Sequence, residues 1–91
     1  MSEKEKIMTK LDVRWERYHA KWQYAKRRKS ILLWQSRRDA CLSLKSLFSE
    51  ILCVSYSKRK CEHILRKQLE AAFASDTPIA HGMVYVLDDI L

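Results

Sequence analysis

A single glycine and a single proline stand among the 91 residues of this chain, and this shortage limits what it can fold into. Each of these residue types normally makes up several per cent of a protein. Sandwiches and barrels need many tight turns, which rely on glycine and proline. Long helices need neither residue. The sequence therefore predicts an all-α fold: a small three- to four-helix bundle or helical hairpin, in one domain over residues 1–91.

The N-terminal stretch predicts one long, basic, amphipathic helix over residues 5–38. Its apolar residues recur at alternating spacings of three and four, which places them on one face of a helix. This apolar seam consists of Met8, Leu11, Trp15, Tyr18, Trp22 and Ala25. The seam then meets Lys29 where the next apolar residue is due, and apolar residues at 31–34 surround the helix instead. A kink or a helix end in this region is the alternative to a continuous helix.

A stripe of positive charge runs beside the apolar seam. At about 100° per residue its members fall within a sector of about 60°, centred about 110° from the seam. This cationic stripe consists of Lys10, Arg14, Arg17, Lys21 and Arg28. Its field attracts nucleic acid, an anionic membrane or an acidic protein surface. The alternative is that the positive charge only keeps an aggregation-prone helical protein in solution.

Three further helices are predicted, over residues 39–55, 58–74 and 78–90. The first two have broad apolar faces, which include Cys41, Leu44 and Phe48 on one and Cys61, Ile64 and Leu65 on the other. Ser57 precedes the helix at 58–74 and has the right chemistry for its N-cap. We expect both apolar faces to be buried in one shared core.

The last helix has a clear start and a rival interpretation. Thr77 as N-cap and Pro78 at the first helical position favour a helix that begins there. Gly82 is its expected weak point, because glycine has low helix propensity. Residues 83–87 favour strand, so a short strand paired with another molecule is the alternative.

No spacing of reactive residues points to an enzyme or a metal site. Cys53, Cys61, His63 and His81 match no zinc-knuckle pattern, and Cys61 and His63 would point about 200° apart on a helix. A Cys–His nucleophile pair would lack a recognisable oxyanion hole. With one glycine, the familiar phosphate-cradling loops are also excluded. We therefore expect no enzymatic activity, no cofactor and no metal.

The cysteines and the N-terminus favour a reducing compartment. Three cysteines without framework spacing fit free thiols in the cytoplasm, or in the nucleus if the source is eukaryotic. The sequence begins Met-Ser-Glu-Lys, unlike a signal peptide, and no apolar run reaches transmembrane length. We expect no membrane partner, because the bundle needs the apolar seam for its core.

The leading hypothesis is a non-enzymatic helical protein-interaction module, a dimeric adaptor, inhibitor or regulator of a larger assembly. Trp15, Tyr18 and Trp22 would bind the partner, and the cationic stripe would face its acidic surface. A homodimer would bury the same patch on both copies. The alternative is a small DNA- or RNA-binding protein, in which the stripe follows the phosphate backbone and Tyr24 stacks on a base. Aromatic residues at helical spacing are also common in cores, which is a third explanation for the three rings.

Overall fold

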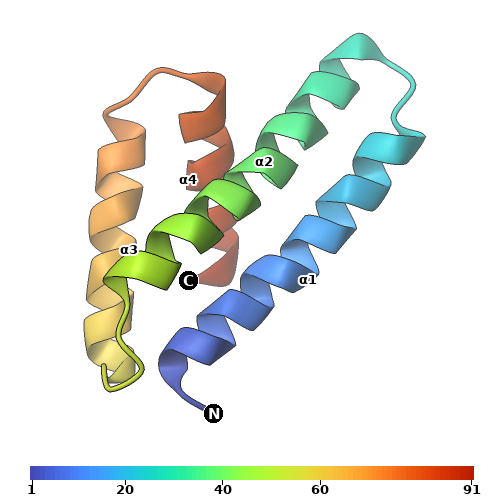
Figure 1. Cartoon of the computed structure of the whole chain (residues 1–91). Coiled ribbons are helices and arrows are strands. Elements are labelled where there is room, and N and C mark those ends of the chain that lie inside the picture. Colours follow the sequence, from blue (N-terminus) through green and yellow to red (C-terminus); the bar gives the residue numbers. More distant parts are fainter.

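The chain folds into four packed helices and has no strands, as the computed structural model of residues 1–91 shows (Figure 1). The helices are α1 (Glu3–Tyr24), α2 (Arg28–Ile51), α3 (Lys58–Phe73) and α4 (Pro78–Ile90). α1 and α2 form one antiparallel hairpin, and α3 and α4 form another. This architecture confirms the all-α prediction, and α4 rules out the strand alternative at residues 83–87. None of the four helices has both the length and the apolar character to cross a membrane.

Three of the helices begin with a hydroxyl cap. The side-chain oxygens of Ser2, Ser57 and Thr77 each accept a hydrogen bond from the backbone N–H three residues further on, at 3.1–3.2 Å. Such a bond satisfies an N–H group that a helix start leaves without an intrahelical partner. The predicted caps at Ser57 and Thr77 are therefore confirmed. α2 follows Arg27 and has no side-chain cap.

The N-terminal helix ends at Tyr24, so its predicted end at residue 38 is wrong. Ala25 and Arg27 have extended backbone, with ψ of 132° and 139°, and the chain turns back between them. The predicted start of a helix at residue 39 is also wrong, because α2 already begins at Arg28. Folding back packs the apolar face of α1 on that of α2, and one straight helix could not form this contact. Burial therefore outweighs the local helix propensity at the turn.

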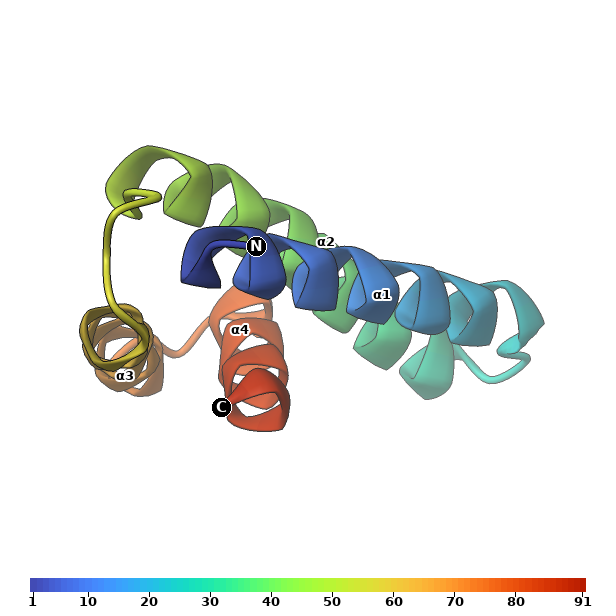
Figure 2. The same cartoon turned by 90° about the horizontal axis from the view of Figure 1, so that it is seen from below.

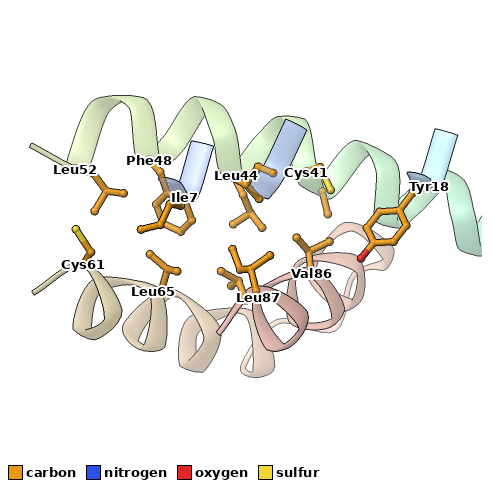
Figure 3. Close-up of a cluster of buried hydrophobic side chains, with 13 residues drawn as sticks. Ile7, Tyr18, Cys41, Leu44, Phe48, Leu52, Cys61, Leu65, Val86 and Leu87 are labelled. Atoms are coloured by element: carbon orange, nitrogen blue, oxygen red, sulfur yellow. The ribbon is translucent and has the colours of Figure 1, made fainter. Parts of the chain in front are cut away.

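The core lies between the two hairpins (Figure 3). Side chains of α2 point toward side chains of α3 and α4, and Ile7 and Tyr18 enter from α1. Leu11, Leu44 and Phe48 have no exposed surface. The apolar faces predicted for residues 39–55 and 58–74 supply much of this cluster: Cys41, Leu44 and Phe48 from α2, Leu52 directly after α2, and Cys61 and Leu65 from α3. The periodicity of the sequence therefore identified the buried faces even where it misplaced a helix boundary.

Gly82 sets the distance between α4 and α2. A Cβ atom at this residue would lie 2.5 Å from the carbonyl oxygen of Ser36 and 3.1 Å from the Cβ of Ala40. Cβ atoms do not approach a carbonyl oxygen that closely, so the two helices can cross here only because residue 82 has no side chain. The glycine that was expected to weaken α4 thus allows α4 to pack closely on α2.

The turn of the α1–α2 hairpin extends past the α3–α4 hairpin (Figure 2). α4 crosses α2 near Ser36 and Ala40, so the residues of α2 before this crossing lie on the overhanging side. The molecule is correspondingly elongated, with principal extents of 43 × 28 × 18 Å. This overhanging end positions the candidate site.

Candidate functional site

The excess positive charge of the chain lies in residues 17–38, which we call the basic arm. This segment has no acid and contains eight cations: Arg17, Lys21, Lys26, Arg27, Arg28, Lys29, Arg37 and Arg38. Residues 1–16 hold four residues of each sign, and residues 39–91 hold six Lys or Arg against seven acids. The arm comprises the end of α1, the turn at 25–27 and the first half of α2, and it includes the overhanging turn of the hairpin (Figures 1 and 2).

The turn at 25–27 divides the predicted cationic stripe. Lys10, Arg17 and Lys21 lie exposed on α1, whereas Arg28 begins α2. Arg14 is partly covered, because its guanidinium pairs with the carboxylate of Asp89 in the last turn of α4. Three of the five predicted residues belong to the basic arm and two do not. The sequence signal that marks the arm is the absence of acids between Glu16 and Asp39. A stripe defined by helical periodicity does not detect this signal.

Cations and aromatic rings pack together on one side of the arm. The Lys21 ammonium lies 5.1 Å from the centroid of the Trp34 ring, and the Arg37 guanidinium lies 4.8 Å from it. Arg37 also lies 3.5 Å from the ring centroid of Tyr85 on α4. The Tyr18 ring is 5.9 Å from both Trp34 and Tyr85, centroid to centroid. Cation–π attraction and aromatic packing thus hold the base of the arm against α4.

A second aromatic group lies on another side of the hairpin. Trp15 and His19 stack with ring centroids 4.7 Å apart, and His19 and Trp22 with centroids 5.5 Å apart. Arg38 of α2 lies 4.4 Å from the Trp22 centroid, and its Nη1 is 3.3 Å from His19 Nδ1. Arg38 also donates to Asp39 at 3.2 Å. The guanidinium therefore joins α2 to the stacked rings of α1.

The three aromatic residues predicted to bind a partner make contacts within the chain. Tyr18 is buried, and its hydroxyl donates to Asp89 Oδ2 at 3.2 Å. Burial, and then the negative charge of Asp89, raises the pKa of this hydroxyl above its ordinary value of 10.0. Trp15 and Trp22 are half-buried, and their covered indole N–H groups have no acceptor. Contacts within the chain therefore cover much of the surface of these rings.

The tip of the basic arm is slightly concave and open to solvent. A hollow of about 390 Å³ lies beside the turn, and we call it the tip hollow. The cations that line it are Lys21, Lys26 and Arg27, and the aromatic residues are Tyr24 and Trp34. Tyr24 is 82% exposed. The sequence placed Tyr24 only at the edge of the cationic stripe, and the hairpin turn adds Ser30 and Trp34 of α2 to its surroundings.

A larger groove of about 600 Å³ separates the arm from the start of α4. Leu32, Leu33 and Ser36 line it from α2, and Pro78 and His81 line it from α4. Lys29 and Arg37 lie on the α2 side and Asp76 on the opposite side. Both leucines are about half exposed. The arm thus has a cationic hollow at its tip and a partly apolar groove along its flank.

Comparison with known proteins finds no matching family model, no matching curated sequence and no matching solved structure.

The cysteines and histidines considered as metal ligands lie apart. No three metal-ligating side chains come together in the structure. Cys61 is in the core, where burial raises the pKa of its thiol, whereas Cys53 is exposed in the α2–α3 connection. A hydrogen bond with Ser55 lowers the pKa of the Cys53 thiol. His81 pairs with Asp76 at 3.1 Å on the surface.

Substitution of Asp89 by asparagine is expected to destabilise the protein near neutral pH and to have no effect in strong acid. Hydrogen bonds from Arg14 and Tyr18 hold the pKa of Asp89 below the ordinary value of 3.8. A lowered pKa in the folded state contributes stability above the unfolded-state pKa, and this stability is lost as the pH falls through the folded-state pKa. Because the Asp89 side chain is 41% exposed, solvent screening limits the effect to about 1 kcal/mol or less.

Urea unfolding at about pH 7 and about pH 2 tests this expectation, since protonated Asp89 resembles asparagine in acid. Asp88→Asn is the matched control, because Asp88 is an exposed neighbour without an ion pair. Equal losses in the two variants, or a loss for Asp89→Asn that persists in acid, would contradict the assigned role of the Arg14–Asp89 pair.

Proposed function

We propose that this protein is a non-enzymatic nucleic-acid-binding protein whose basic arm contacts the phosphate backbone. The observation that carries this proposal is an acid-free segment with eight cations, whose turn extends past α3 and α4 and whose base packs on α4 at Arg37. Each phosphate that Lys or Arg neutralises releases condensed counterions, so a dense cluster of cations favours binding at low salt. Contacts of this kind position a protein on the backbone and carry no sequence information directly.

The exposed cations of the arm favour nucleic acid over an acidic protein surface. Six of the eight cations are exposed, and they come from α1, the turn and α2. Three of these six are lysines, which are depleted at protein interfaces, and such interfaces usually have an apolar centre. The rings that would form such a centre, Trp15, Tyr18 and Trp22, make their contacts within the chain. The exposed cations come from three segments of the arm, and a flexible polyanion can contact all three.

We also propose that the protein acts in the cytoplasm, or in the nucleus of a eukaryotic cell. All three cysteines are free thiols. Free thiols persist in compartments that glutathione and thioredoxin keep reducing.

Neutralising the tip of the arm is expected to weaken binding to a labelled DNA strand at least tenfold at low salt. The variant changes four exposed cations to glutamine: Lys26, Arg27, Arg28 and Lys29. Fluorescence anisotropy titrations over a range of salt concentrations measure the affinity and its salt dependence. The slope of log K against log salt should become shallower by about 0.7 for each lost phosphate contact.

The matched control removes the same charge from α3. It changes Lys58, Arg59, Arg66 and Lys67 to glutamine, all of which are exposed and outside the arm. Because both variants keep the same net charge, a loss common to both would show that total charge, and not the arm, controls binding. Wild-type protein that binds no DNA at low salt would overturn the proposal, and circular dichroism shows that each variant remains folded.

A dimeric adaptor is the second candidate function, and the groove between the arm and α4 favours it. Leu32 and Leu33 lie half exposed there, and apolar surface of this kind can mark a protein interface. Light scattering on the same samples gives the molar mass. A dimer that binds no nucleic acid would replace the first proposal with this one.

A further inference from the structure

The aromatic ring at the tip of the arm is free, unlike the other rings of the arm. Trp34 contacts Lys21 and Arg37, and Trp22 contacts His19 and Arg38. Tyr24 takes part in no aromatic pair and no cation–π contact, and it is 82% exposed. Packing within the chain therefore does not account for this ring. An exposed ring on an ordered helix end is a surface on which a flat apolar group can stack.

Three cations line the tip hollow together with this ring. Lys26 and Arg27 make no ion pair, and Lys21 lies on the Trp34 side of the hollow. A ligand with a flat apolar ring and adjacent negative charges would fit the hollow, because the ring could stack on Tyr24 and the charges could pair with the cations. A nucleotide has this chemistry: its base presents two π-faces, and its phosphates lie on either side along the chain.

We propose that the tip hollow binds an unpaired nucleobase, which stacks on Tyr24 while Lys21, Lys26 and Arg27 contact the flanking phosphates. This inference rests on the proposed nucleic-acid binding by the arm and adds a preference to it. Bases in an uninterrupted duplex are stacked on each other and cannot reach a side-chain ring, so a duplex offers the tip only phosphates. The arm should therefore prefer single strands, loops and ends over a continuous duplex.

Substitution of Tyr24 separates the two kinds of contact. Tyr24→Ala should weaken binding to a labelled single-stranded DNA about fivefold to a hundredfold, since stacking on one aromatic side chain has an effect of that size. Binding to the same strand annealed to its complement should change less than about twofold, because phosphate contacts remain. Tyr24→Trp, which keeps a stacking surface, should retain the single-strand affinity. Phe73→Ala is the matched control, because Phe73 is also an exposed ring and lies outside the arm.

The outcomes distinguish this inference from the function on which it rests. If Tyr24→Ala binds both DNAs like the wild type while the arm variant loses both, the base-binding site is wrong and the arm proposal stands. Equal weakening of single-stranded and duplex binding by Tyr24→Ala would also overturn the base-binding site. Wild-type protein that binds neither DNA would overturn both proposals.

Discussion

Replacing Phe48 with alanine is expected to lower the free energy of unfolding by about 3–5 kcal/mol. Phe48 has no exposed surface and belongs to the cluster to which all four helices contribute (Figure 3). Removal of the ring loses apolar burial and leaves a cavity in a close-packed interior, and both effects destabilise the fold. Small proteins typically have a total stability of only about 5–15 kcal/mol. The variant should therefore unfold at a much lower urea concentration than the wild type.

The chain contains its own control for this experiment. Phe73 is the only other phenylalanine, and it is 69% exposed at the end of α3. Phe73→Ala removes the same atoms from the surface and should change the stability by less than about 0.5 kcal/mol. Similar losses of stability in the two variants would contradict the burial of Phe48 between the helices.

A side chain at residue 82 is expected to force α2 and α4 apart. In an exposed helix, Gly→Ala would stabilise by about 1 kcal/mol. At Gly82 the added Cβ would meet the Ser36 carbonyl oxygen at 2.5 Å, which is backbone and cannot rotate away. We expect Gly82→Ala to destabilise by about 1–3 kcal/mol, the usual cost of overpacking, and Gly82→Val to destabilise more. Urea unfolding followed by far-ultraviolet circular dichroism gives the values.

Ala71→Val provides the comparison for the valine variant, because Ala71 is exposed on α3. There the added atoms meet solvent, and only the modest helix penalty of a β-branched residue remains, below about 1 kcal/mol. A Gly82→Ala variant as stable as the wild type would mean that α4 can shift on α2 without cost, and would contradict the close crossing at Ser36.

Local chemistry made much of the fold predictable. Ser57 and Thr77 mark helix starts because their hydroxyls cap the backbone, which depends only on residues nearby in sequence. The faces that carry Phe48 and Leu65 are buried because their periodicity matches a helix. The shortage of glycine and proline excluded folds with many tight turns. Caps, periodicity and composition are local properties, and they do not depend on which helix packs on the opposite side of the core.

The turn at residues 25–27 was not predictable in the same way. It contains neither glycine nor proline, and Lys26 and Arg27 are good helix formers. The only local sign was that the apolar seam failed at Lys29. Whether the chain turns there depends on the gain from packing α1 on α2, which is a property of the whole fold.

The same reason explains which parts of the candidate site the sequence missed. The charge of the arm is visible in composition. The pairing of Arg14 with Asp89 joins residues 75 positions apart, so it removed one predicted member from the free cationic surface. Tyr24 gained its place in the tip hollow only because the hairpin turn lies beside it.

The position of the basic arm gives the molecule an electric dipole. Residues 17–38 have a net charge of +8, residues 1–16 are neutral and residues 39–91 have a net charge of −1. An approaching polyanion therefore attracts one end of the molecule and orients it before contact. Such steering raises association rate constants by about 10- to 1000-fold at low salt, and it fades as dissolved ions screen the field. If the arm binds a polyanion as proposed, the overhanging turn would influence the rate of association in addition to the place of binding.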